Sequence, residues 1–305
     1  MISRNIKVNY EAFLRLEKSL SDNTLEAYMR DLAAFEVFME DLGLEYNTVK
    51  LEDLQRFIES LALLGISERS RARIISGIRA FYRYCDIDGI LKNNPTELLD
   101  QPKLPIYIPD VLSVEEVKRI IESVDLSEVD KYSGLAVGLR NRAIMEMLYG
   151  SGLRVSELLG IRLSQLAMGE DFCKILGKGN KERLVPISTE AKKAIGYWII
   201  EREKLPIKYR QDDVLFLNRR GAKMTRQMIF QIIKTSVEKA GITKIVSPHT
   251  FRHSFATHLL EGGANLRVIQ QLLGHSSIVT TEIYTHIDMR MMREEILKFH
   301  PRNSC

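Results

Sequence analysis

Two histidines and an arginine directly follow Ser247-Pro248 in the stretch SPHTFRHSFATHLL. Serine followed by proline is typical of a helix start, because serine caps free N–H groups and proline has no N–H to leave unpaired. On such a helix His249, Arg252 and His253 share one face. A helix N-terminus also carries free N–H groups and a partial positive charge. The stretch therefore predicts a site for an anion, and phosphate is the natural candidate.

Two other hypotheses account for the same residues. His249 and His253 have the i, i+4 spacing of metal ligands, but the glutamate of an HExxH motif is absent and Arg252 would repel a cation. We therefore expect no metal and no other cofactor. The second alternative is that the helix has only a structural function. We expect His258 to be structural in either case, because it lies on the phenylalanine side of the helix.

The phosphate hypothesis predicts further cations and a nucleophile elsewhere in the chain. Arg154 follows Gly152 at the start of a predicted helix, and Lys178 lies in the turn GKGN. His275 follows a glycine that ends a helix, and Tyr284 lies on the next predicted helix. Each of these residues taken alone has an ordinary structural explanation, so the specificity lies in the complete set.

The set resembles the active site of the tyrosine site-specific recombinases. Its six positions match in order and spacing: Arg154, Lys178, His249, Arg252, His275 and Tyr284. The resemblance extends over nearly the whole chain and is greatest to the bacterial Xer recombinases. It is carried by SDNTLEAYMRDL, RNRAIMEMLYGSGLRVSELLGI, ILGKGNKERLVPIS and SPHTFRHSFATHLLEGGANLRVIQQLLGHSSIVTTEIYTHI.

The resemblance implies a reaction in which Tyr284 attacks a DNA phosphodiester. The protein becomes joined to the 3′-phosphate, a 5′-hydroxyl leaves, and a 5′-hydroxyl later reverses the step. Because the covalent intermediate stores the bond energy, neither ATP nor a metal is required. Arg154, Arg252 and His275 would then neutralise the phosphate oxygens, a task that metal ions perform in many phosphoryl transfers.

The remaining roles also follow from the resemblance. His249 would be the general base for the tyrosine, whose reference pKa is about 10. Lys178 would protonate the leaving 5′-oxygen, with Lys181 as the alternative acid. We expect Glu157, three residues after Arg154, to orient that arginine.

The elements that carry these residues predict a mainly α protein with one small antiparallel sheet. Residues 1–100 show helical patterns, and FCKILGKGNKERLVPIS predicts a β-hairpin around GKGN. The stretch 93–110 contains four prolines, and we take 101–110 as a linker. The resemblance implies a SAM-like core-binding domain over 1–100 and a catalytic domain over 111–305, which together form a C-shaped clamp on DNA.

Charge is unevenly distributed along the chain. The net charge of +4 divides into −4 for residues 1–100 and +8 for residues 101–305, which suggests a polyanionic partner. In the predicted helix 69–84 no acidic residue lies between Glu68 and Asp86. Four arginines fall on one side of it, and we expect them to be unpaired and to contact phosphates: Arg69, Arg73, Arg79 and Arg83. A solvated outer face is the alternative.

The expected partner is double-stranded DNA. Resemblance to Xer recombinases further implies a homotetramer, or a heterotetramer with a paralogous recombinase, on a dif-like site, with a septal DNA translocase as trigger. The helix predicted over 289–301 would either pass to a neighbouring protomer or fold back on its own domain. Absence of a long apolar run and of a secretory signal predicts a cytoplasmic protein without a membrane partner.

Three alternatives to an Xer recombinase remain open. One is an integrase or transposase of a phage or conjugative element. The others come from different functional classes: a DNA-binding regulator without cutting activity, and a metal-dependent nuclease.

Overall fold

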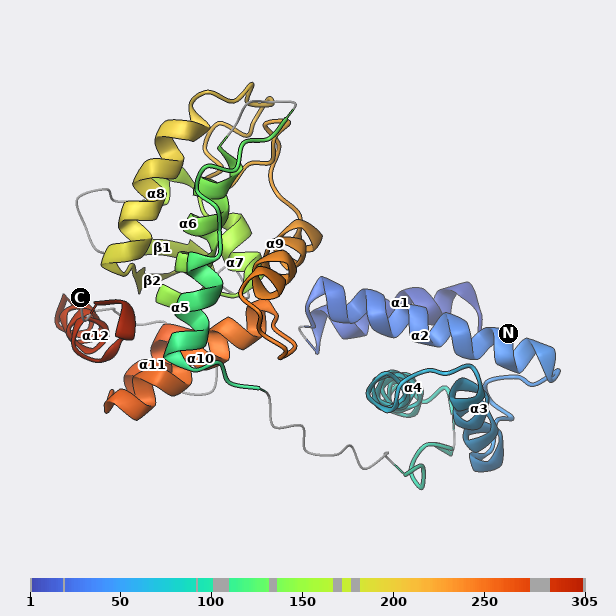
Figure 1. Ribbon diagram of the computed structural model, residues 1–305. Coiled ribbons are helices and arrows are strands. Elements are labelled where there is room, and N and C mark those ends of the chain that lie inside the picture. Colours follow the sequence, from blue (N-terminus) through green and yellow to red (C-terminus); the bar gives the residue numbers. More distant parts are fainter. Residues whose placement is uncertain are drawn as a thin grey trace. The chain divides into compact units, whose positions relative to one another are not determined.

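The computed structural model describes most of the chain, and its helices and strands are shown in Figure 1. The described residues are 2–18, 20–91, 93–100, 110–131, 136–166, 172–176, 182–274 and 286–303. The chain divides into two compact units, Met1–Tyr107 and Ile108–Cys305. Residues 101–109 of the predicted linker lie outside the described residues. None of the described helices is both long and apolar enough to cross a bilayer.

The first unit is built from helices that begin at capped positions. They are α1 (Arg4–Leu16), α2 (Asp22–Asp41), α3 (Leu51–Leu63) and α4 (Glu68–Ile87). The side chain of Ser21 accepts a hydrogen bond from the N–H of Thr24 and so caps the start of α2. In α4 the apolar side is buried, and it includes Ile75, Phe81 and Tyr82. The mainly helical character of this part of the chain is thus confirmed.

The arginines of α4 are not all unpaired, which corrects the sequence-based expectation. Arg73 forms an ion pair with Asp31, whose side chain is only 5% exposed. Arg79 donates to the backbone oxygen of Leu99. Both partners lie outside α4 in the sequence, so the lack of acidic residues between Glu68 and Asp86 gave no indication of them. Arg83 is exposed.

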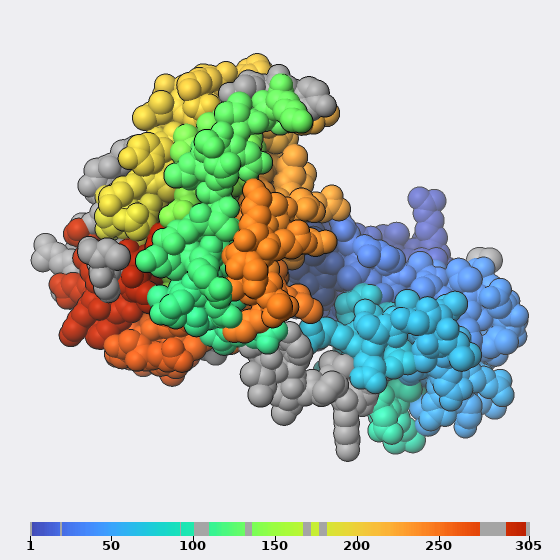
Figure 2. All heavy atoms as spheres, viewed as in Figure 1, coloured from blue at the N-terminus to red at the C-terminus, as the bar shows by residue number. Residues whose placement is uncertain are grey.

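The second unit is mainly helical with one hairpin. Its helices are α5 (Val114–Glu122), α6 (Val137–Gly150), α7 (Val155–Gly160), α8 (Thr189–Arg202), α9 (Arg226–Lys239), α10 (Pro248–Gly262), α11 (Leu266–Leu273) and α12 (His286–Phe299). Short 3₁₀ helices are η1 (Leu163–Gln165) and η3 (Pro301–Asn303). On the face shown in Figure 2, α5 (green) and α9 (orange) lie side by side, and they pack against each other.

The predicted hairpin is present as two antiparallel strands, β1 (Phe172–Leu176) and β2 (Glu182–Pro186). Leu176 pairs with Glu182 at the end nearest the turn. Residues 177–181, which include Lys178 and Lys181, lie outside the described residues.

Gly152 brings α7 close to α10. Its φ of +57° is favourable only for glycine, and a Cβ at this position would lie 2.4 Å from Cδ1 of Phe255. Phe255 is fully buried in α10. Gly152, between α6 and α7, therefore does two things: it turns the chain, and it lets α10 approach the residues just before Arg154.

We predict that Arg73→Ala destabilises the first unit by about 1–2 kcal/mol, because Asp31 would remain buried without its counter-ion. The loss of stability stays modest because Arg73 is partly exposed and solvent screens its charge. The measurement is thermal unfolding of the full-length protein. Arg83→Ala, on the exposed side of the same helix, is the matched control and should change stability by less than about 0.5 kcal/mol. Equal behaviour of the two variants would show that the Asp31 contact contributes nothing.

Candidate active site

Arg154 is fixed by a carboxylate one turn along its own helix. Its backbone N–H donates to Oε2 of Glu157 at 2.8 Å, and its Nη1 donates to Oε1 of Glu157 at 2.9 Å. Arg154 thus occupies the N-cap position of α7, with Glu157 as the reciprocal partner. The arginine side chain remains 35% exposed, so it is anchored at one side and accessible at the other.

Glu157 also holds an arginine that the sequence analysis did not select. Arg183 of β2 donates from Nη1 to Oε1 at 2.8 Å and from Nη2 to Oε2 at 2.9 Å. The Arg183 side chain is 7% exposed and that of Glu157 is 4% exposed. A signal for Arg183 exists in the hairpin, because strand alternation places it on the same buried face as Val185. A charged residue at an inward position needs a counter-ion.

A third guanidinium completes the group around this carboxylate. Nη1 of Arg252 lies 3.9 Å from Oε2 of Glu157. Although burial alone would raise the pKa of Glu157, the hydrogen bonds and charges of Arg183 and Arg154 hold it below its usual value. One buried carboxylate therefore neutralises part of the charge of three arginines and leaves the cluster cationic.

Arg252 is held in place by backbone oxygens. Its Nη1 donates to the Gly152 carbonyl at 2.7 Å, and its Nη2 donates to the Leu273 carbonyl. Burial, followed by the positive charge of Arg154, lowers the pKa of Arg252 to about 10. The side chain is therefore still charged at neutral pH. The two bonds use only part of the N–H donors of the guanidinium, so donors remain for an anion.

The end of α11 is tied to the same arginines. Gly274 ends this helix with a φ of +62°, and its carbonyl accepts from Nη2 of Arg154 at 3.4 Å. A Cβ on Gly274 would lie 3.2 Å from Cζ and from Nε of Arg183. Gly274, the last described residue before His275, thus lies directly beside the arginine cluster. His275 and Tyr284 themselves lie outside the described residues.

The start of α10 agrees with the sequence prediction. Ser247 is the N-cap and accepts from the N–H of Thr250 at 3.3 Å, and Pro248 is the first helical residue. His249 and His253 are exposed, whereas Arg252 is buried. The three predicted residues therefore differ in environment: the arginine belongs to the cluster around Glu157 and both histidines face solvent.

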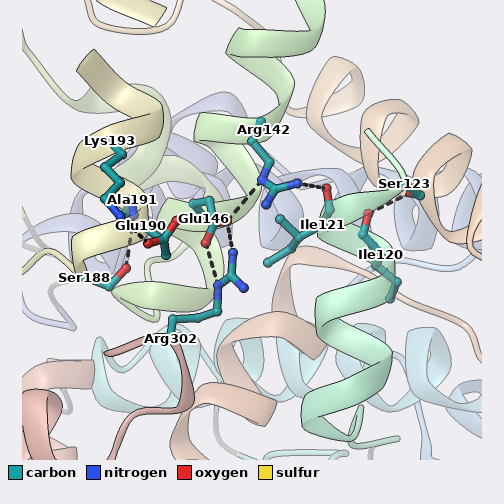
Figure 3. Close-up of polar contacts among 10 residues, drawn as sticks. All are labelled: Ile120, Ile121, Ser123, Arg142, Glu146, Ser188, Glu190, Ala191, Lys193 and Arg302. Carbon is teal, nitrogen blue, oxygen red and sulfur yellow. Dashed lines mark hydrogen bonds and ion pairs between the residues drawn. The ribbon is translucent and has the colours of Figure 1, made fainter. Parts of the chain in front are cut away.

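The segment after the predicted nucleophile is anchored on its own unit. Figure 3 shows Arg302, from η3, at Glu146 of α6, and the carboxylate also accepts from Nε of Arg142 at 3.1 Å. His300 is fully buried, with its ring centroid 4.8 Å from that of Tyr149. Burial lowers the pKa of His300 to about 3, so its ring is neutral. Of the two placements expected for the C-terminal helix, the chain by itself adopts the folded-back one.

His258 is structural, as predicted. It is buried, its Nδ1 lies 2.8 Å from the hydroxyl of Tyr149, and burial lowers its pKa. Within the described part of the chain, His, Cys, Asp and Glu form no group of three or more suited to a metal ion.

The arrangement is suited to an oxyanion. Arg154 and Arg252 approach each other although both are positive, and Glu157 offsets their repulsion from behind. A phosphate bound against the two guanidinium groups would supply the charge that the cluster lacks, through charge-assisted hydrogen bonds. The structure thus brings together Arg154, Arg252 and Glu157, and it places Gly274 beside Arg154.

Comparison with known proteins gives matches over both units. The model of the phage integrase family matches residues 110–291, and that of the phage integrase N-terminal SAM-like domain matches residues 8–86. Tyrosine recombinase XerD of Chlorobaculum tepidum is 40% identical over 290 residues, which cover 95% of this chain and 94% of the relative. Tyrosine recombinase XerD of Staphylococcus haemolyticus is 40% identical over 294 residues, covering 96% and 97%.

Solved structures share the fold. XerH recombinase bound to a palindromic difH substrate, in a post-cleavage complex, matches with a TM-score of 0.69 and 23% identity, over 95% of this chain and 84% of that chain. A lambda integrase dimer bound to a COC′ core site matches with a TM-score of 0.70 and 17% identity, over 93% and 100%. These matches confirm the predicted fold class of the chain.

We predict that Glu157→Gln destabilises the second unit by on the order of 3 kcal/mol at pH 7, because the arginines lose a buried counter-ion. The folded-state pKa of Glu157 is lowered, so its contribution is present above the unfolded value of about 4.3 and is lost as the pH falls through the folded value. The difference in thermal midpoint between wild type and variant should therefore shrink below about pH 4.

The matched control is Glu190→Gln, which removes a surface partner of Lys193. It should change the midpoint little at any pH. If the difference between wild type and Glu157→Gln stays constant from pH 7 to pH 3, the ionised carboxylate is not what stabilises the cluster.

Proposed function

The chain belongs to the phage integrase family, and on this premise we propose that it is an Xer-type tyrosine recombinase that cuts and rejoins DNA at a specific site. The observation that carries the proposal is the cluster of Arg154, Arg252 and Glu157, with the Gly274 carbonyl bonded to Arg154. The extent of the similarity to XerD proteins supports it: two relatives are each 40% identical over nearly the full length of both chains.

The reaction begins with attack of the Tyr284 hydroxyl on a backbone phosphorus. A bond forms between the phenolic oxygen and phosphorus, the bond to the 5′-oxygen breaks, and the protein is left as a 3′-phosphotyrosyl adduct. A 5′-hydroxyl of the same or a second duplex then attacks the adduct and releases the tyrosine. Each step exchanges one phosphodiester for another, so the reaction needs no ATP.

Arg154 and Arg252 stabilise the charge that develops on the non-bridging oxygens. Guanidinium groups suit this task because they stay charged and donate paired hydrogen bonds in a fixed plane. Arg252 keeps its proton at neutral pH even with its pKa lowered to about 10. Fixed donors need no reorganisation during the reaction, and loss of one such donor typically slows catalysis by about 10²–10³-fold. His275 is the third donor.

Proton transfers complete the mechanism. His249, exposed at the start of α10, accepts the proton of Tyr284. Lys178, in the turn between β1 and β2, gives a proton to the leaving 5′-oxygen, and Lys181 is the alternative donor. Glu157 orients Arg154 through the two bonds described above.

Double-stranded DNA is the substrate, and it is contacted by a core-binding domain over residues 1–100 and by a catalytic domain over residues 111–305. Arg69 and Arg83 of α4 contact backbone phosphates. Arg73 and Arg79 also belong to this surface, but their bonds to Asp31 and Leu99 give them a structural role as well. Metal ions and other cofactors are not required.

Recombination between two duplexes requires four protomers, so the protein acts as a homotetramer or as a heterotetramer with a paralogous recombinase. The reaction served is resolution of chromosome dimers at a dif-like site in the cytoplasm, with a septal DNA translocase as activator. Integration of a phage or conjugative element is the alternative use of the same chemistry. The high identity to XerD proteins favours the first.

A nicked duplex that carries a dif-like site tests the proposal, because loss of the short 5′ fragment traps the covalent adduct. We expect wild type to form the adduct equally well with and without EDTA, and Tyr284→Phe to form none. Tyr197→Phe, which alters an exposed tyrosine of α8, is the matched control and should react like wild type.

Three results would contradict the proposal. An adduct with Tyr284→Phe would exclude this nucleophile. Loss of cutting in EDTA would indicate a metal-dependent nuclease. Tight DNA binding by wild type without any adduct would indicate a DNA-binding regulator.

A further inference from the structure

Arg183 lies where the hairpin meets the arginine cluster. It is the first buried residue of β2, because the preceding residue, Glu182, is exposed. Leu176, which pairs with Glu182 on β1, is 46% exposed. Ile175, which pairs with Arg183 across the hairpin, is buried in the core, and farther from the turn Cys173 and Val185 are buried as well. Among the charged side chains of the two described strands, Lys174 and Glu182 pair with each other, whereas Arg183 pairs with Glu157 outside the hairpin.

The contacts of Arg183 are directed and bidentate. Two parallel bonds to Glu157, at 2.8 and 2.9 Å, fix both the position and the plane of the guanidinium. The same carboxylate holds Arg154. Because Arg183 and Arg154 share this carboxylate, a displacement of β2 changes the position of Arg154, and a displacement of Arg154 changes the position of the hairpin.

The third side of the Arg183 guanidinium faces the end of α11. A Cβ on Gly274 would lie 3.2 Å from Nε. Among the atoms of the described residues none accepts a hydrogen bond from this Nε, although it is buried. A buried donor without a partner is unfavourable for stability. The placement of Arg183 is therefore better explained by the groups that it holds together than by the stability that it adds.

Resting on the proposed function, we propose that Arg183 is a positioning residue that couples the Lys178-bearing hairpin to the arginine cluster around Glu157. Through this coupling Arg183 positions the general acid, Lys178, relative to the arginines that bind the phosphate. Loss of Arg183 then affects two tasks unequally: it impairs protonation of the leaving 5′-oxygen strongly, and it impairs stabilisation of the phosphate less, because Arg154 retains its own bonds to Glu157.

The two tasks are separated by replacing the bridging 5′-oxygen at the cut position with sulfur. In the normal substrate the bond from phosphorus to oxygen breaks and the alkoxide must take a proton. In the 5′-thio substrate the bond from phosphorus to sulfur breaks and the sulfur leaves as a thiolate, which needs no proton because an alkyl thiol has a pKa of about 8.5. A defect in the general acid disappears with this substrate, whereas a defect in phosphate stabilisation persists.

The experiment measures the rate of adduct formation on nicked duplexes of both kinds. We expect Arg183→Gln to slow cutting of the normal substrate by about 10–100-fold, the range typical of residues that orient a group in contact with the reaction. With the 5′-thio substrate the rate should return to within a few-fold of wild type, and affinity for the uncut duplex should stay unchanged. Arg183→Lys, which keeps the charge near Glu157 but loses the paired bonds, should show the same pattern more weakly.

Lys174→Gln is the matched control, because it removes a cation from the same hairpin whose partner is the exposed Glu182 rather than Glu157. It should react like wild type on both substrates. Lys178→Ala should be rescued by sulfur, which calibrates the assay.

The outcomes separate this inference from the proposed function. Absence of any adduct with wild type contradicts the proposed function. If wild type cuts but the Arg183 variants are equally slow on both substrates, Arg183 supports only the phosphate-binding arginines and the coupling is wrong. Wild-type rates for both Arg183 variants on the normal substrate would also overturn it.

Discussion

A single buried carboxylate, Glu157, is the constraint on which the proposed active site depends. Three guanidinium groups contact or approach it, and they come from parts of the chain that are distant in sequence: the start of α7, strand β2 and the N-terminal part of α10. Without a shared counter-ion, such cations would repel one another in a poorly solvated site. With Glu157 as the shared counter-ion, the cluster keeps a net positive charge and a fixed geometry, so its guanidinium groups are already oriented when a phosphate binds. This is electrostatic preorganisation built from protein groups alone.

The surrounding fold supplies the close approaches that this cluster needs. Gly152 allows Phe255 of α10 to pack against the turn before Arg154, and it offers its carbonyl to Arg252. Gly274 ends α11 in a left-handed conformation and leaves space for the Arg183 guanidinium. Both glycines thus provide a backbone turn and a contact that a side chain would block. The C-terminal segment is tied down separately, through Arg302 and Glu146, so the chain on both sides of Tyr284 is anchored on the same unit.

Local patterns made much of the fold predictable. Serine followed by proline predicted the start of α10, and Ser247 caps that helix with Pro248 as its first residue. Alternation around GKGN predicted the β1–β2 pairing. Long-range partners were not predictable, because a sequence does not show which distant residues meet. The bond between Arg73 and Asp31 corrected the expectation of unpaired arginines, and Arg183 was missed although its inward strand position was visible. The roles of the six candidate residues remain predictions.

The most direct measurement is a crystal structure of the protein on a nicked duplex with vanadate bound at the nick, where vanadate imitates the phosphorus at mid-reaction. The account predicts that Arg154 and Arg252 both donate to oxygens of one vanadate with the Tyr284 oxygen in line, while Glu157 still bridges Arg154 and Arg183. A vanadate contacted by neither arginine, or a Glu157 that has released both, would contradict it.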